Sequence, residues 1–219
     1  DFKQLTNIFK KCHTILWSGG KNDPTTAFDE MSKLLFAKIK DECDTHNNEA
    51  YQYQIGLNEN EEVVAKRIKG IYDNAKRSDP NVFSEEIKAS DTQINQVVKN
   101  LQCISLRETD IDAKGQAFET FLGVVFRGGL GQYFTRRQIV EFVVDMLEPT
   151  EKDIIIDPSC GSGGFLLYSM RNVLKEIDKN YEGDNRLIAK NANKFCHNNI
   201  FGIEINEKIA RVAMMDMIV

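Results

Sequence analysis

Residues 154–166 read Ile-Ile-Ile-Asp-Pro-Ser-Cys-Gly-Ser-Gly-Gly-Phe-Leu. The three isoleucines are typical of a strand buried on both faces of a parallel sheet, and Pro158 ends it because proline cannot donate to the ladder. The glycines allow a tight loop, and the apolar pattern from Phe165 onward predicts a helix that begins at this loop. A strand, a glycine-rich loop and a helix in this order predict a pocket for a small polar ligand.

The loop fits neither of the two common phosphate-binding patterns. It lacks the Gly-Lys-Ser/Thr ending of a P-loop, and Asp157-Pro158 stands where a dinucleotide fold would begin its Gly-x-Gly-x-x-Gly. An acid at the strand tip suits a cationic head group better than a pyrophosphate. These residues therefore favour the amino group and sulfonium of S-adenosylmethionine.

A second acid-tipped strand is expected at 200–205, which reads Ile-Phe-Gly-Ile-Glu-Ile. The two strands form a βαβα pattern that needs a right-handed crossover, and ligands bind beyond the carboxyl ends of such strands. Glu204 is placed to accept hydrogen bonds from ribose hydroxyls. Its distance from Asp157 exceeds the ~20 residues of the simple fingerprint, which we attribute to an additional helix over 186–197.

Helical periodicity covers most of the remaining chain. Asp23, Thr135 and Asn206 are placed as N-caps, and the helix after Thr135 is expected to bury Ile139, Val140, Val143, Met146 and Leu147. The polar stretch 44–60 predicts a long loop. The predicted helices cover 3–17, 24–41, 63–72, 94–101, 112–126, 135–147, 165–177, 186–197 and 207–217. We therefore expect an α/β protein, with a helical N-terminal domain at 1–112 and the first part of an α/β domain at 113–219.

The composition is that of an ordinary globular protein, with 42% hydrophobic and 28% charged residues and a net charge of -5. Any nucleic-acid contact must therefore come from local basic patches. One candidate over 60–77, with Lys66, Arg67, Lys69, Lys76 and Arg77, is better explained as a solvated helix face. Because no apolar run approaches the ~20 residues of a membrane helix and no signal peptide precedes the first helix, we expect a cytoplasmic protein with no membrane partner.

The five cysteines form no Cys-x-x-Cys pair, which argues against a disulfide framework and a zinc ribbon. Neighbouring side chains such as Cys12-His13 and Cys196-His197 rarely converge on one ion, so no metal site is predicted. Cys160 has no histidine nearby in sequence to activate it and is expected to fill the loop rather than act as a nucleophile.

Four stretches carry a resemblance to a known family. They are Trp17 to Ile39 with Asp29-Glu30 and Lys33-Leu34-Leu35-Phe36, Lys114 to Glu119, Gly131-Gln132-Tyr133-Phe134-Thr135, and the 157–166 loop with Gly202-Ile203-Glu204-Ile205-Asn206. Together they resemble the N-terminal part of the modification subunit of type I restriction-modification systems, a gamma-type adenine DNA methyltransferase. The resemblance implies a Rossmann-like S-adenosylmethionine-dependent methyltransferase domain, here truncated.

The family's roles are carried over onto matching positions. Gln132, Tyr133, Phe134 and Thr135 would lie against the methionine end of S-adenosylmethionine, and Glu204 would hold its ribose. The loop would wrap the amino-acid part of the cofactor through Asp157, Pro158, Gly161, Ser162, Gly163 and Gly164. The family usually has proline after the Phe-Thr pair, whereas this chain has Arg136.

Methylation of adenine requires a flipped base, acceptors for its exocyclic amine and an aromatic face. The family supplies these with an Asn/Asp-Pro-Pro-aromatic motif, but the four prolines here are all isolated. We therefore expect a fragment without catalytic residues and inactive alone, from a protein that methylates adenine in double-stranded DNA. Its partners would be the specificity and restriction subunits of a type I system.

Two alternatives remain open at the level of sequence. A nucleotide-dependent oxidoreductase could be built on the same sheet, and it would prefer a dinucleotide to S-adenosylmethionine. A non-catalytic assembly module would use its helical half to bind partner subunits and would have no affinity for the cofactor.

Overall fold

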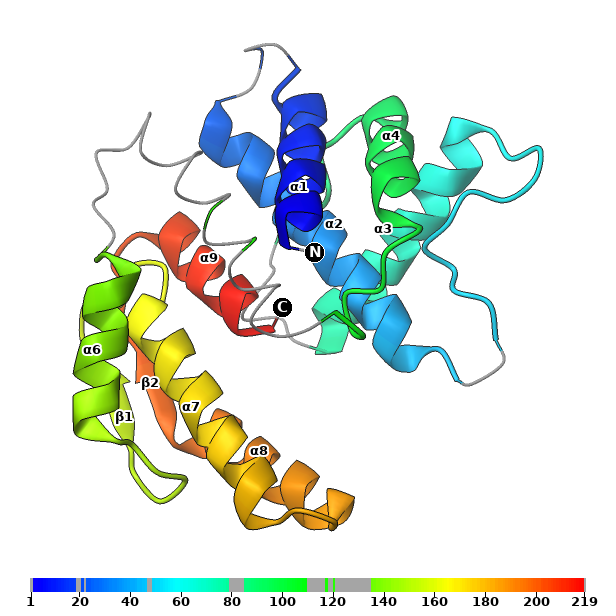
Figure 1. Ribbon diagram of the computed structural model, residues 1–219. Helices are drawn as coiled ribbons and strands as arrows, with labels where there is room; N and C mark the ends of the chain where they lie inside the picture. The colour runs from blue at the N-terminus through cyan, green and yellow to red at the C-terminus, as the bar shows by residue number, and fades with distance from the viewer. Residues whose placement is uncertain are drawn as a thin grey trace. The chain divides into compact units, whose positions relative to one another are not determined.

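The computed structural model describes residues 2–18, 21, 23–46, 49–78, 85–109, 117, 120 and 135–218. The chain divides into two compact units, Asp1–Gln132 with Ile218–Val219, and Tyr133–Met217 (Figure 1). The predicted domain boundary at residue 112 lies outside the described residues and stays a prediction. Most of the helix predicted over 112–126 also lies outside them.

The first unit is helical in the part that the structure describes. Its helices are α1 (Phe2–Trp17), α2 (Pro24–Asp44), α3 (Glu61–Ser78) and α4 (Asp91–Leu101), which confirms the helices predicted there. α2 contacts α1 and α3, and α4 also contacts α1 and α3 (Figure 1). Their apolar stripes form a common core that includes Phe9, Leu16, Met31, Leu34, Leu35, Val64, Ile68, Tyr72, Ile94, Val97, Val98 and Leu101.

α2 also buries charged side chains, which fix the neighbouring connections. Lys33 is fully buried, and its Nζ lies 2.7 Å from Oε1 of Glu30. The other oxygen of Glu30 accepts hydrogen bonds from the backbone N–H groups of Lys88 and Ala89, at 2.7 and 2.8 Å. The segment that leads into α4 is therefore attached to α2 by a buried carboxylate.

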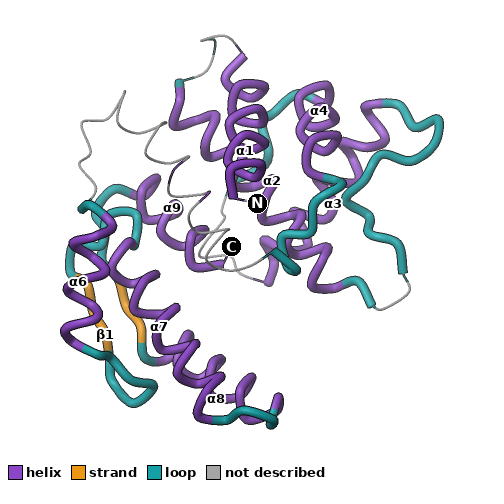
Figure 2. Tube along the Cα trace, viewed as in Figure 1, coloured by secondary structure: helices purple, strands orange, loops and turns teal. Residues whose placement is uncertain are grey.

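The second unit is an α/β arrangement (Figure 2). Its elements are α6 (Arg137–Leu147), β1 (Ile155–Asp157), α7 (Gly164–Asn180), α8 (Asn185–Asn198), β2 (Ile200–Gly202) and α9 (Glu207–Ile218). β1 and β2 are parallel, and the register pairs Ile155 with Ile200 and Asp157 with Gly202. The predicted strand-helix-strand order and the additional helix before the second strand are confirmed.

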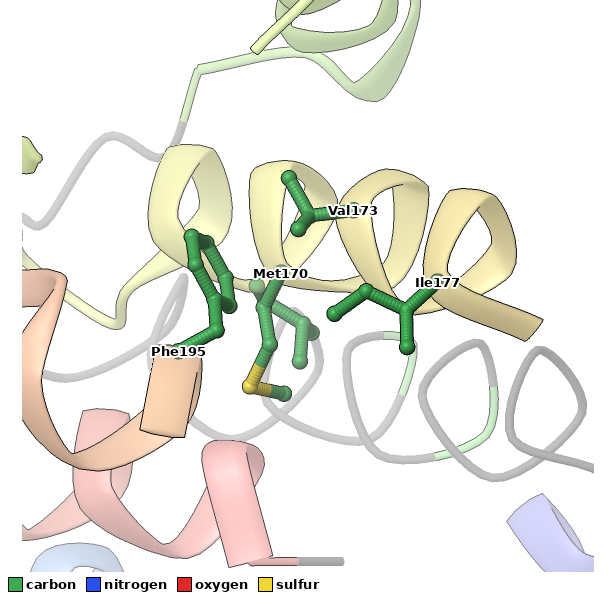
Figure 3. Packing of buried hydrophobic residues seen from close by; sticks show 5 residues of the cluster. Met170, Val173, Ile177 and Phe195 are labelled. Atoms are coloured by element: carbon green, nitrogen blue, oxygen red, sulfur yellow. The ribbon is translucent and has the colours of Figure 1, made fainter. Parts of the chain in front are cut away.

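The core of this unit lies between α7, α8 and one face of the two strands. Met170, Val173 and Ile177 of α7 are buried with Phe195 of α8 (Figure 3). Ile155 of β1 and Ile200 of β2 pack against the same cluster. The spacing of the α7 residues by three and four positions explains why one helix face can cover both strands.

Three local predictions were wrong. The isoleucine run is not buried on both faces, because Ile154 and Ile156 are 72% and 61% exposed and α7 covers only the face that carries Ile155. The second strand ends at Gly202 instead of reaching residue 205. A strand is buried on both faces only if a layer of secondary structure packs against each face. In the described residues, a helix packs against one face of this sheet.

The third correction concerns α6. Its N-cap is Arg136 and not Thr135, and no side chain caps it. Val140 is buried as predicted, but Ile139, Met146 and Leu147 are 51%, 70% and 74% exposed. The buried face is instead formed by Val140 and Val144, so the sequence pattern alone did not select the side of the helix that packs.

None of the described helices is both long enough and apolar enough to cross a membrane.

Candidate functional site

The two predicted acids lie at the same edge of the sheet. Asp157 is the last residue of β1, and Glu204 follows the end of β2 by two residues. The strands are parallel, so their carboxyl ends share one edge. Beyond the strands, the N–H of Ile203 donates to the carbonyl of Asp157 at 2.9 Å, and the N–H of Cys160 donates to the carbonyl of Ile203 at 3.0 Å. These bonds join the two segments that carry the acids.

Each carboxylate is held by a backbone N–H group close to it in sequence. Oδ1 of Asp157 accepts from the N–H of Ser159 at 3.0 Å, and Oε1 of Glu204 accepts from the N–H of Asn206 at 2.8 Å. Both side chains are half-buried. A carboxylate has about four lone-pair sites, so each can still accept hydrogen bonds from a ligand.

The glycine loop forms the turn between β1 and α7. Gly161 and Gly163 have φ values of +54° and +83°, which side-chain-bearing residues rarely adopt. The N–H of Gly163 donates to the carbonyl of Cys160 at 2.8 Å and closes the turn. A Cβ atom at Gly163 would lie 3.2 Å from the Cβ of Ala213 in α9, so the backbone passes close to that helix.

The N-terminus of α7 faces this loop without a side-chain cap. Gly163 is the N-cap residue and makes no side-chain hydrogen bond, while Gly164 begins the helix. A Cβ atom added at Gly161 or Gly164 would meet nothing within 4 Å. Backbone N–H groups at the positive end of a helix dipole are suited to a carboxylate or another anionic group.

Gly202 was not predicted as part of the site. A Cβ atom there would lie 2.7 Å from Cδ1 of Leu166 and 3.0 Å from Sγ of Cys160. A side chain at this position would have to displace the end of Leu166 and the thiol of Cys160, so glycine lets these side chains of the loop and of α7 pack directly against β2. A glycine inside a short apolar strand was the available signal for such an approach.

Cys160 lies near both acids. Burial raises the pKa of its thiol, and the nearby charges of Asp157 and Glu204 raise it further. A thiol whose pKa is raised stays protonated near neutral pH, and the thiolate is the nucleophilic form. This arrangement argues for a packing role in the loop.

The other predicted positions are distributed as follows. Pro158 is exposed and Ser162 is half-buried in the same loop, while Thr135 is exposed shortly before α6. Gln132, Tyr133 and Phe134 lie outside the described residues.

These features can be tested against the cofactor that the sequence predicts. S-adenosylmethionine carries a carboxylate, an amino group, a sulfonium and a ribose with two hydroxyls. The site offers uncapped helix N–H groups for the carboxylate, Asp157 for the cationic part and Glu204 for the hydroxyls. The open space beside Gly161 and Gly164 leaves the backbone accessible. The residues present therefore fit this cofactor.

Comparison with known proteins places these features in a family. Residues 109–219 match the family of N-6 DNA methylases. The type II restriction enzyme and methyltransferase RM.BcgI of Heyndrickxia coagulans is 30% identical over 112 residues, which are 50% of this chain and 16% of that protein. The type I restriction enzyme HindI methylase subunit of Haemophilus influenzae is 30% identical over 131 residues, which are 58% of this chain and 26% of that subunit.

A solved structure shares the fold. It is a modification subunit assigned to a type I restriction enzyme from Vibrio vulnificus, with a TM-score of 0.59 and 14% sequence identity. The similarity covers 99% of this chain and 53% of that one. The chain thus spans about half of the solved subunit and between 16% and 26% of the two curated relatives. The family match covers half of the chain and includes both acid-tipped strands and the glycine loop, and the chain therefore belongs to the N-6 DNA methylase family.

Proposed function

We propose that this chain is the S-adenosylmethionine-binding part of an adenine-specific DNA methyltransferase, the modification subunit of a type I restriction-modification system. The second unit would be the start of a Rossmann-like methyltransferase domain. One observation carries the proposal: Asp157 and Glu204 lie at the same sheet edge, where a glycine turn leads from β1 into the uncapped N-terminus of α7. This combination matches the charges of the cofactor along its length.

The proposed roles follow from the chemistry of each group. Glu204 accepts hydrogen bonds from the ribose hydroxyls, and its bond from the N–H of Asn206 keeps the carboxylate oriented. Asp157 attracts the cationic part of the methionine moiety. Gly161, Gly163 and Gly164 allow the backbone to approach the amino-acid end of the cofactor. When bound, the cofactor supplies an electrophilic methyl group.

Gln132, Tyr133, Phe134 and Thr135 are proposed to complete the methionine end of the site, on the resemblance of their motif. The DNA-facing chemistry is proposed to depend on residues other than those of this chain. Transfer to the exocyclic amine of adenine needs acceptors and a stacking face, and no Asn/Asp-Pro-Pro-aromatic tetrapeptide occurs in the sequence. We therefore expect the chain to bind the cofactor and to transfer no methyl group to DNA by itself.

The partners are inferred from the relatives. Several of the matching proteins are methylase subunits of type I restriction enzymes, including those of Haemophilus influenzae and Escherichia coli. Double-stranded DNA and the specificity and restriction subunits are the corresponding partners for the whole protein. The first unit, with its helices α1 to α4, is the candidate for these subunit and DNA contacts.

Calorimetric titration of the chain with S-adenosylmethionine and, separately, with NAD tests the proposal. We expect binding of S-adenosylmethionine at one site and weaker or undetectable binding of NAD. Preference for NAD would instead support an oxidoreductase. Absence of cofactor binding in both this chain and the complete protein, with partner subunits still bound, would support a non-catalytic assembly module.

A further inference from the structure

The outer face of α8 carries a basic stripe that the proposed methyltransferase site does not use. α8 reads Asn-Arg-Leu-Ile-Ala-Lys-Asn-Ala-Asn-Lys-Phe-Cys-His-Asn and contains no aspartate or glutamate, although the chain as a whole has a net charge of -5. Its exposed polar side chains recur with helical spacing and share one face, with the buried Phe195 on the opposite side. We call Arg186, Lys190, Asn193, Lys194 and His197 the α8 stripe.

The cations of the α8 stripe are available to a partner. In the part of the chain that the structure describes, Arg186, Lys190 and Lys194 are exposed and form no ion pair. α3 provides a contrast, because there Arg67 pairs with Glu59 and Lys69 pairs with Asp91. The basic residues of α3 are thus partly neutralised within the protein, whereas those of α8 are not.

A polar cavity of about 390 Å³ extends the basic surface at the C-terminal part of α8. Its lining includes Lys194 and Asn191 of α8 and Lys152 from the turn before β1. Glu151 also lines it, and one of its oxygens accepts a hydrogen bond from the hydroxyl of Tyr181 at 2.9 Å. The cavity therefore holds two lysines and one carboxylate, and Lys152 is the basic side chain that it adds beside the stripe.

The stripe lies away from the proposed cofactor site. α8 ends directly before β2 begins, so its last turn is at the amino edge of the sheet, whereas Asp157 and Glu204 are at the carboxyl edge (Figure 1). α7 begins at the carboxyl edge, and its 17 residues span about 25 Å, so the chain has passed the amino edge of the three-residue strands when α8 begins. A ligand on α8 is therefore distinct from the methyl donor and from a base beside it.

We propose that the α8 stripe binds the phosphate backbone of double-stranded DNA, as a contact separate from the methyl-transfer site. Lysine and arginine neutralise phosphates, and asparagine amides donate hydrogen bonds to them. From residue 186 to residue 197 the stripe is about 16 Å long. One strand of a duplex presents about five phosphates over this length.

The surface chemistry favours DNA over an acidic protein. Protein interfaces depend on buried aromatic and apolar anchors, whereas phosphate contacts need none. Leu187 is 39% exposed and lies beside the stripe, whereas the stripe itself consists of polar side chains and offers no apolar anchor to a protein partner. Asp184 is the nearest carboxylate at the start of the helix, and it is occupied in capping through the N–H groups of Arg186 and Leu187.

The test measures the binding of a fluorescent DNA duplex to the whole chain over a range of salt concentrations, without S-adenosylmethionine. The double variant Lys190→Gln/Lys194→Gln should bind several-fold more weakly, and the slope of log K against log salt should become smaller by about 2. The matched control is Lys175→Gln/Lys179→Gln on α7, which removes two exposed lysines with the same spacing beside Glu176 and Asp178. The control should bind DNA nearly as well as the unaltered chain.

A second measurement needs no variant. DNA should protect Lys190 and Lys194 of the unaltered chain from an amine-acetylating reagent, as read by mass spectrometry. The proposal would be overturned if both double variants lost the same DNA affinity, if the salt slope did not change, or if DNA left Lys190 and Lys194 open to acetylation. Competition by polyglutamate as effective as that by DNA at equal charge would instead assign the stripe to an acidic protein. Because the cofactor is absent, failure of the proposed methyl-donor site would not affect these results.

Discussion

Gly163 is constrained both by its own backbone and by its neighbour. Its φ value of +83° is unfavourable for other residues, and a Cβ atom would lie 3.2 Å from that of Ala213. Gly183 has a similar φ value of +89° but open space around it. We predict that Gly183→Ala lowers the free energy of unfolding by about 1 kcal/mol through backbone strain alone, and that Gly163→Ala lowers it by about 2 kcal/mol or more. Denaturant titration measures both, and equal losses would contradict the close packing.

His13 gives the first unit a predictable response to acid. Burial lowers the pKa of its ring from the ordinary 6.5, and the hydrogen bond with the carbonyl of Pro24 opposes this shift. The folded state therefore favours the neutral ring. The resulting stability is fully present above the unfolded pKa of about 6.5 and is lost as the pH falls through the lower, folded pKa.

His13→Gln should remove this part of the pH dependence. We predict that the unaltered chain loses more unfolding free energy than the variant when the pH falls from about 7.5 to about 5.5. His46→Gln is the control for the removal of a histidine, because His46 is exposed. Thermal unfolding at both pH values decides the matter, and identical curves for the two variants would refute the role of His13.

At the scale of residues, the sequence was sufficient for groups whose role depends on their own strand. Asp157 and Glu204 could be predicted at the sheet edge because each follows an apolar run directly. Gly202 could not be assigned a role, because its contacts with Cys160 and Leu166 come from a segment about 40 positions earlier. The proposed roles of Gln132, Tyr133 and Phe134 remain predictions.

At the scale of elements, α2 offers a comparison between buried and exposed ion pairs on one helix. Lys33 and Glu30 are buried, whereas Lys40 and Asp44 are 29% and 60% exposed in their side chains. Glu30→Ala should lower the free energy of unfolding by about 3 kcal/mol, chiefly because it removes the acceptor of two backbone N–H groups, whereas Lys33 keeps Asp29 at 3.1 Å. Asp44→Ala should cost less than about 1 kcal/mol.

Chemical denaturation of both alanine variants measures this difference. Similar losses for Glu30→Ala and Asp44→Ala would show that the buried carboxylate does not hold the segment before α4. Restoration of stability by Glu30→Gln would show that hydrogen bonding, more than charge, accounts for the effect.

The helices were predictable because a period of 3.6 residues is visible in a single segment. Which of their apolar side chains are buried was harder to predict. The pattern of α6 contains apolar residues on more than one side, and the structure buries Val140 and Val144 while Ile139 and Met146 stay exposed. The isoleucine run showed the same limit, because burial of a strand depends on layers contributed by distant parts of a chain.

At the scale of the whole molecule, charge and chemistry are distributed unevenly. The chain is acidic overall, yet α8 carries only basic and neutral side chains, and the proposed cofactor groups gather at the opposite edge of the sheet. The sequence predicted the order of strands and helices in the second unit. It could not single out α8 as a surface, because the identification of free cations requires knowledge of which lysines and arginines form ion pairs.

The affinity of the chain for S-adenosylmethionine, compared between Glu204→Gln and Glu207→Gln, tests the central claim most directly. Glu207 is exposed in the first turn of α9 and undergoes the same chemical change three positions away. We predict that Glu204→Gln weakens binding about tenfold, as expected for the loss of charge-assisted hydrogen bonds to the ribose, and that Glu207→Gln leaves it unchanged. Equal affinities for both variants and the unaltered chain would contradict the proposed site.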